Sequence, residues 1–139
     1  MNQPRAVYSG HPGPGNPVDG IALVASDNFS ARYDLNLAKG IFSRPTHKLV
    51  GQSYVGKILV LNIAKGGVAT AWMLREMVQT GLAPMALILN SANPIMAQGA
   101  AFAGLPLIDR FELDITSVLN SGDRLAVDPA AGTVCVKND

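Results

Sequence analysis

The stretch over residues 57–84 constrains the fold most, because a buried strand, a glycine turn and a helix follow one another there without a gap. Its sequence is KILVLNIAKGGVATAWMLREMVQTGLAP. The apolar run over 57–63 predicts a strand that is covered on both faces. A helical pattern begins directly after Gly66 and Gly67 and stops at Gly81, with Pro84 just beyond it. A strand that leads straight into a helix indicates an α/β domain.

The start of this helix is a candidate binding site for an anion. The first N–H groups of a helix have no partner within the helix, and that end carries about half a positive charge. Carboxylates and phosphates bind at such ends. We therefore expect Lys65, Gly66 and Gly67 to contact a small anionic ligand, with the Thr70 hydroxyl in reach. A tight turn that needs positive φ, a solvated lysine and a core-packed threonine are the alternatives, since the turn lacks the spacing of a P-loop or a dinucleotide motif.

The rest of the chain predicts further strands, one more helix and a hairpin. Strands are expected over 20–25, 84–90 and 106–108, and a hairpin over 122–137. A second helix is expected to begin at Asn93 and Pro94 and to end at Gly104. Loops are expected over 26–51. Glycines and prolines over 10–20 predict a flexible lead-in over 1–19, which leaves a domain over 20–139. The expected class is α/β, with a mixed sheet or small barrel and two main helices.

Composition narrows the possible partners. Only 15% of the residues are charged, well below the usual proportion of about a quarter, which indicates that another chain covers part of the surface. The net charge of +1 without a basic run argues against nucleic acid. We find no signal peptide or membrane span and expect a cytoplasmic setting. The single Cys135 cannot form an internal disulfide or hold a metal alone, and no Cys/His cluster is present, so we expect no metal in this chain.

Two further residues have open interpretations. His47 lies in a polar loop, where a histidine usually decorates the surface, but it could also donate to an anion or carry a proton near pH 7. At 100° per residue, the apolar face of the first helix is shared by Thr70, Ala71, Leu74, Met77 and Val78. Trp72 falls in the charged sector instead. It either folds over a neighbouring loop or anchors a partner surface, where tryptophan is enriched.

Several segments follow the order and spacing of one known family. GIALV over 20–24 resembles the family's opening strand, and Phe29 and Asp34 followed by Gly40 resemble its Phe-Trp-Gly-Gly-x-Asp-Pro loop. His47, Leu49 and GQS over 51–53 resemble its His-Pro-Leu-x-Gly-x-Ser run. GKILVL over 56–61, GLAP over 81–84, NPIMA over 93–97 and the hairpin also match. From about residue 20 to 136, the chain resembles the small subunit of the aconitase X group, the swivel domain of that branch of the aconitase superfamily.

This resemblance implies a fold and a function. The fold is a swivelling β/β/α domain, and the function is that of the small subunit of a hydro-lyase that dehydrates a small hydroxy acid. A large subunit would form a heterodimer with this chain and supply an iron–sulfur cluster or iron as a Lewis acid. This chain would close over the substrate, hold a carboxylate at Gly66 and Gly67, with His47 nearby, and be inactive alone. Family substrates include hydroxyproline-type compounds and phosphorylated hydroxy acids.

The turn before the first helix departs from the family pattern. Where the family has Gly-Arg-Gly-Ser-Ser-Ser, residues 64–69 are AKGGVA. In the superfamily a serine of this domain is the expected base. Either Thr70 replaces that serine, or the partner supplies the base, or the substrate differs and the turn only binds an anion; we favour the last. A non-catalytic assembly module is an alternative. Residues 66–71 also resemble a phosphohistidine swivelling domain, but Ala71 stands in place of the histidine that would carry the phosphate.

Overall fold

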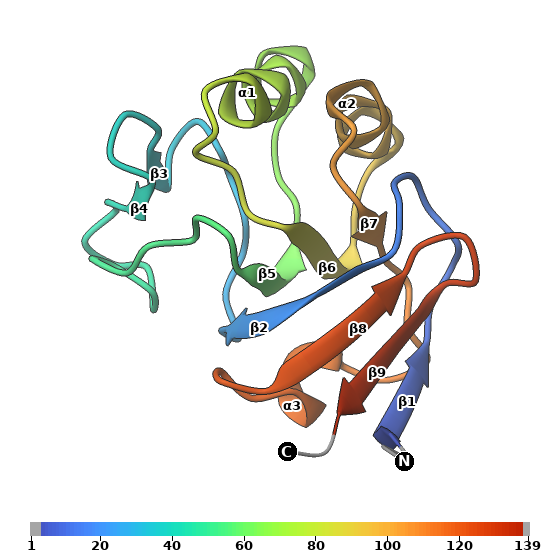
Figure 1. The fold of residues 1–139 in the computed structure, drawn as a ribbon. Coiled ribbons are helices and arrows are strands. Elements are labelled where there is room, and N and C mark those ends of the chain that lie inside the picture. Colours follow the sequence, from blue (N-terminus) through green and yellow to red (C-terminus); the bar gives the residue numbers. More distant parts are fainter. Residues whose placement is uncertain (1–3, 138–139) are drawn as a thin grey trace.

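The computed structural model describes residues 4–137, which form a seven-stranded mixed sheet in the order β1-β9-β8-β2-β5-β6-β7 and a separate two-stranded ribbon of β3 and β4 (Figure 1). The strands are β1 (Pro4–Ser9), β2 (Val18–Val24), β3 (Leu35–Asn36), β4 (Ile41–Phe42), β5 (Ile58–Ile63), β6 (Ala86–Ser91), β7 (Leu107–Ile108), β8 (Arg124–Asp128) and β9 (Thr133–Lys137). The helices are α1 (Val68–Gln79), α2 (Pro94–Ala103) and α3 (Ile115–Val118). This arrangement confirms the expected α/β class.

The parallel strands β2, β5, β6 and β7 separate two hydrophobic cores. Along β5, Leu59 and Leu61 pack into the core beneath α1 and α2. Ile58 and Val60 pack into the second core, with α3, β8 and β9. All four side chains are fully buried, which confirms that β5 is covered on both faces. Figure 1 shows α1 and α2 side by side on one face and α3 on the other.

The two edges of the sheet are linked, so that it curls into a partly closed barrel. β1 pairs antiparallel with β9. The chain then crosses to β7, where the His11 N–H donates to the Asp109 carbonyl at 2.8 Å and the Leu107 N–H donates to the Pro14 carbonyl at 3.1 Å. The structure thus differs from the flexible lead-in predicted over 1–19, because residues 4–14 take part in the sheet; residues 1–3 lie outside the described residues.

The capping residues and glycines in the sequence predicted the ends of both long helices correctly. α1 begins directly after Gly67, and Gly81 beyond its end has a φ of +76°. α2 begins after Asn93, whose side chain accepts a hydrogen bond from the Met96 N–H, and ends at Gly104 with a φ of +72°. The short α3 and the β3–β4 ribbon lie in segments without a clear period, and the ribbon's segment was expected to be loop.

Candidate functional site

The candidate site lies where the parallel strands end and the two long helices begin. β5 ends at Ile63 and α1 begins at Val68, so the loop 64–67 lies at the carboxyl edge of the sheet. Open α/β sheets bind their ligands at this edge. Gly66 has a φ of +128°, and a Cβ there would lie 2.4 Å from the Thr70 Oγ1. The turn therefore needs glycine at this position.

The first N–H groups of α1 are open. Gly67 occupies the N-cap position without a side-chain hydrogen bond. Within residues 4–137, no acceptor is bonded to the N–H groups of Val68 and Ala69, and residues 65–69 are exposed. The start of α2 differs, because the Asn93 Oδ1 accepts from the Met96 N–H at 2.9 Å. A ligand site at α1 requires amides that are neither capped nor enclosed, and this geometry meets that condition.

Hydrogen bonds hold the loop 64–67 in place from both sides. The Asn93 Nδ2 donates to the Gly66 carbonyl at 3.1 Å. The Lys65 N–H donates to the Phe29 carbonyl at 2.7 Å, and the Ala64 N–H donates to the Ser91 carbonyl at 3.0 Å. The amides of α1 therefore keep a fixed direction before any ligand arrives, which lowers the entropy cost of binding.

A cavity of roughly 420 Å³ opens beside the loop. It is lined by Asp27, Asn28, Ser30, Tyr33, Asp34, Arg44, Lys65 and Gly66. The Arg44 guanidinium is already engaged: it pairs with Asp34, lies 3.8 Å from Asp27 and donates to the Thr46 hydroxyl at 2.6 Å. In the described part of the chain, the Lys65 ammonium has no acidic partner. Lys65 is thus the cation available to an incoming anion.

The Asp27 carboxylate stays ionised in this cavity wall. Burial alone would raise its pKa, but hydrogen bonds from the backbone N–H groups of Lys48 and Asn28 outweigh that cost, helped by the nearby Arg44 guanidinium, and the net pKa is lowered. Asp34 also faces Arg44, so this wall carries two carboxylates against one guanidinium. This leaves the α1 amides and Lys65 to attract the ligand.

The structure places His47 inside the wall of the cavity. Its side chain is 0% exposed, which excludes surface decoration, one of the two interpretations that the sequence left open. The Nε2 lies 2.8 Å from the Asn28 carbonyl and the Nδ1 accepts from the Leu49 N–H at 3.1 Å. This pattern assigns the neutral ring with its proton on Nε2. Both nitrogens are therefore occupied within the chain, and the ring contacts Asn28, which lines the cavity.

An aromatic stack explains why His47 is enclosed. Its ring stacks on Phe42 with 4.5 Å between the centroids, and Tyr54 packs edge-on against the same phenylalanine at 5.8 Å. Burial raises the pKa of Tyr54 to about 12. The sequence analysis missed this stack, and it missed Asp27, Asn28 and Arg44 as cavity residues. The available signal for the first two was their position just after β2, at the carboxyl edge of the sheet.

Thr70 lies directly beneath the glycine turn. It is 3% exposed and shares the buried face of α1 with Leu74 and Met77, as predicted. Its hydroxyl oxygen lies 2.4 Å from the position that a Cβ on Gly66 would take. The structure therefore brings Lys65, Gly66, Gly67 and Thr70 together, with Thr70 covered by the turn.

Two observations concern metals and membranes. Among residues 4–137, no three His, Cys, Asp or Glu side chains gather closely enough to ligate a metal ion, so the residues present do not fit an iron or iron–sulfur centre. None of the helices in the described residues combines the length and apolar character needed to cross a membrane.

Comparison with known proteins identifies the family. A family model described as the aconitase X swivel domain matches residues 8–136. The chain belongs to this family. This confirms the resemblance that the sequence motifs indicated, and the solved structures agree. Aconitase X from Thermococcus kodakaraensis, in its holo-form, matches this swivel domain with a TM-score of 0.87 and 27% identity, covering 94% of this chain and 98% of the matched chain.

Relatives of this swivel domain include proteins named as small subunits of phosphomevalonate dehydratase. The phosphomevalonate dehydratase small subunit of Methanocella arvoryzae is 31% identical over 125 residues, which are 90% of this chain and 95% of that subunit. The corresponding subunit of Methanopyrus kandleri is 32% identical over 107 residues, which are 77% of this chain and 79% of that subunit.

Proposed function

We propose that this chain is the small subunit of a two-chain hydro-lyase that dehydrates a small phosphorylated hydroxy acid, with phosphomevalonate as the first candidate. The family and the named small subunits support this assignment. The observation that carries it is the open start of α1, where the amides behind Gly66 and Gly67 are exposed and uncapped and Lys65 stands beside them. This group suits one anionic end of such a substrate.

The large subunit completes the site in this proposal. The metal centre that the family resemblance implies belongs to that subunit, since the described residues of this chain do not fit it. The substrate lies between the two chains, and this domain closes over it. Closure excludes water and brings the α1 amides to the substrate carboxylate. The chain alone is inactive, and the pair works in the cytoplasm.

Dehydration breaks a C–O bond on one carbon and a C–H bond on the next, a double bond forms between them, and the hydroxyl group and the proton leave as water. When the proton leaves the carbon beside a carboxylate, negative charge moves onto the carboxylate oxygens. The amides of Val68 and Ala69, which the hydrogen bonds of the loop 64–67 orient in advance, stabilise that charge together with the Lys65 ammonium. They therefore bind the transition state more tightly than the ground state.

Thr70 is the candidate base within this chain. Its hydroxyl lies under Gly66 at the positive end of α1, which favours loss of its proton, and it reaches the substrate only if closure shifts the turn that covers it. His47 is a positioning residue in this proposal, since its ring fixes the Asn28 carbonyl in the cavity wall.

The test is co-expression of this chain with its large subunit. We expect the two chains to elute together in size-exclusion chromatography. We expect the pair to remove water from phosphomevalonate, detected by mass spectrometry, and each chain alone to be inactive. A panel with other phosphorylated hydroxy acids and hydroxyproline-type compounds ranks the substrate classes. Separate elution of the chains, or a pair that dehydrates none of these compounds, contradicts the proposal.

A non-catalytic assembly module is the second candidate. It is favoured by the covered Thr70 and by the AKGGVA sequence over 64–69, which contains no serine. Unchanged turnover of the pair with both Thr70→Val and Lys65→Met supports this alternative. A phosphohistidine function has less support, because Ala71 packs against Gly99 and the ring of His47 is enclosed.

A further inference from the structure

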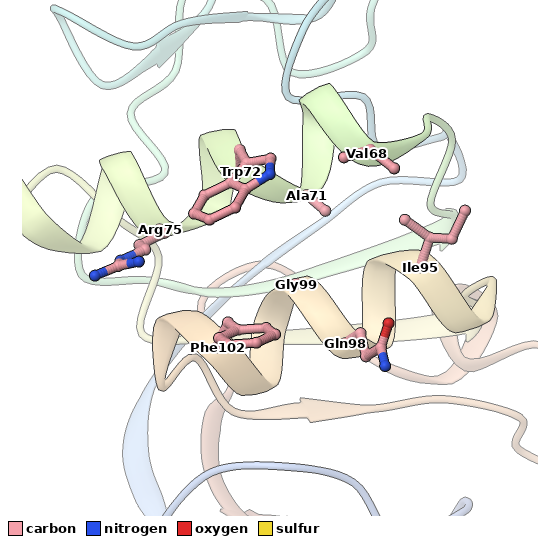
Figure 2. Close-up of a pocket in the computed structure, with 8 residues that line it drawn as sticks. All are labelled: Val68, Ala71, Trp72, Arg75, Ile95, Gln98, Gly99 and Phe102. Carbon is pink, nitrogen blue, oxygen red and sulfur yellow. The ribbon is translucent and has the colours of Figure 1, made fainter.

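An apolar groove runs between α1 and α2 on their exposed side (Figure 2). Its volume is roughly 160 Å³. Figure 2 shows Trp72 on α1 and Phe102 on α2 facing each other across it, with Val68 and Ile95 at the end where the helices begin. The helices approach closely at Gly99, where a Cβ would lie 2.6 Å from the Ala71 Cβ.

The large side chains of the groove are unusually exposed for apolar residues. The exposed fractions are 62% for Val68, 60% for Trp72, 42% for Ile95 and 79% for Phe102. Single exposed apolar residues are common, but a contiguous group of them marks an interaction site. Tryptophan and phenylalanine are enriched at the centres of protein interfaces.

The groove contains one charged residue, Arg75. Its guanidinium carbon lies 5.9 Å from the centre of the Trp72 ring. Among the described residues, no carboxylate pairs with Arg75. The neighbouring Glu76 lines a different cavity, with Leu37 and Leu82. A carboxylate on whatever binds in the groove would form an ion pair with Arg75.

We propose that the groove is the docking site of the large subunit, which seats apolar side chains between Trp72 and Phe102 and sets a carboxylate against Arg75. This inference rests on the proposed function. It adds the face of the chain that recognises the partner, and it concerns binding between the chains rather than the chemistry at the glycine turn.

The position of the groove favours the large subunit as its occupant. Val68 directly follows Gly67, and Ile95 is the second residue of α2. The groove therefore continues from the loop 64–67, which the proposed function sets against the large subunit. Its two aromatic rings and two aliphatic side chains offer a few hundred Å². A stable interface takes roughly 800 Å² from each partner, so this patch needs the adjoining loop to reach that size.

Charge argues against a second copy of this chain. A two-fold self-contact pairs a patch with itself. It would bring two copies of Arg75 into one apolar interface, and the lining of the groove supplies no carboxylate for them. A partner with a different surface avoids this cost.

The single tryptophan permits a direct test without mutation, since Trp72 is the only one in the sequence. The small subunit is labelled with 5-fluorotryptophan and mixed with the unlabelled large subunit. We expect one fluorine resonance whose chemical shift changes when the complex forms. In the complex, this chemical shift should no longer differ between H₂O and D₂O, because the ring is no longer exposed to water. An unchanged resonance in a pair that elutes together overturns the inference.

Substitutions measure the contribution of the groove to binding. We expect Trp72→Ser and Phe102→Ser each to raise the Kd for the large subunit about thirtyfold, the scale of an interface hot spot. Arg75→Glu should also raise the Kd, with a smaller effect in high salt. The control is Leu113→Ser, which changes a side chain that is 42% exposed outside the groove. Circular dichroism melts check that each variant folds.

The outcomes separate this inference from the proposed function. If the groove variants keep the wild-type Kd while the pair dehydrates its substrate, the docking site is wrong and the function stands. If Trp72→Ser abolishes self-association of the small subunit but not binding of the large one, a second copy is the occupant and the inference is overturned. If the groove variants weaken binding and the wild-type pair dehydrates nothing in the panel, the docking site stands and the function fails.

Discussion

Substitutions at Gly67 test the anion site, because this position can be changed with little disturbance of the fold. A Cβ on Gly67 meets nothing within 4 Å, and its φ is −116°. Three variants form a graded series. Gly67→Ala adds a methyl group and leaves the amides open. Gly67→Asn caps them with a neutral side chain, and Gly67→Asp caps them with a charge.

The expected losses follow from the contacts at the start of α1. A hydrogen bond to a charged group contributes about 1.5–3 kcal/mol, so Gly67→Asn should lower kcat/KM of the pair about 10- to 100-fold. Gly67→Asp adds repulsion between two charges about 4 Å apart. This is about 4 kcal/mol at an effective dielectric constant of about 20. Since the site is exposed, we take about half of that value. The expected total is a loss of about a thousandfold, and Gly67→Ala should stay within about threefold.

The assay is steady-state dehydration by the complex, together with a thermal melt of each variant. Asn and Asp are better N-caps than Gly by a few tenths of a kcal/mol, so both variants should be as stable as the wild type or slightly more stable. Activity therefore falls while stability does not. Wild-type kcat/KM in Gly67→Asp refutes the assignment of the site. Equal losses in all three variants would also refute the reasoning, since a lost backbone conformation and not a blocked amide would then be the cause.

Three other changes test neighbouring parts of the account. Thr70→Val should abolish turnover and Thr70→Ser should retain most of it if the hydroxyl is the base; turnover by both at the wild-type rate removes that role. Gly99→Ala should destabilise the chain by about 1–3 kcal/mol, measured by urea unfolding, because the new Cβ would lie 2.6 Å from that of Ala71; an unchanged midpoint contradicts the close helix contact. Hydrogen bonds from the side chains of Thr116 and Asn90 lower the pKa of Asp114 from 3.8, so its contribution to stability is present above pH 3.8 and lost as the pH falls through the folded-state pKa. Asp114 caps the start of α3, where its side chain accepts from the Thr116 N–H. The advantage of the wild type over Asp114→Asn in unfolding free energy should disappear in that acidic range, and an advantage that persists there argues against an ionised Asp114 as the cap.

Strands and helices with local signals could be predicted from the sequence. β5 and β6 are apolar almost throughout because both of their faces are covered, and this leaves a continuous run that needs no knowledge of the neighbours. The ends of α2 are marked by Asn93 and Gly104, whose roles depend on adjacent backbone alone. The buried face of α1 was also correct at Thr70, Leu74 and Met77. Val78, expected on the same face, is 37% exposed in the last turn of the helix.

Features that depend on distant contacts could not be predicted. β1 is held by β9, from the opposite end of the chain, and the glycines and prolines after it gave a local signal for flexibility. His47 is enclosed because Phe42 stacks on it, and Phe42 lies in a ribbon of two-residue strands that shows no period. Arg44 and Asp34 flank the same ribbon, which brings them together, so their pairing was also not foreseen.

The candidate site also has one part that local sequence signals predicted and one part that depends on distant contacts. The turn at Lys65, Gly66 and Gly67 was predicted because a strand, two glycines and a helix are adjacent in the sequence. The same cavity is lined by Asp27 and Asn28, which lie in a segment that the sequence predicted only as a loop. Their position in the cavity can be inferred only once the strands that form the carboxyl edge of the sheet are known.

The central claim is that the uncapped amides of α1 hold the anionic substrate. The most direct measurement is the backbone amide NMR spectrum of the isotope-labelled small subunit in the complex, recorded as phosphomevalonate is added. The account predicts that the amide protons of Val68 and Ala69 move downfield with a common Kd, while that of Met96, which Asn93 already caps, stays in place. Substrate binding that leaves Val68 and Ala69 unmoved would contradict it.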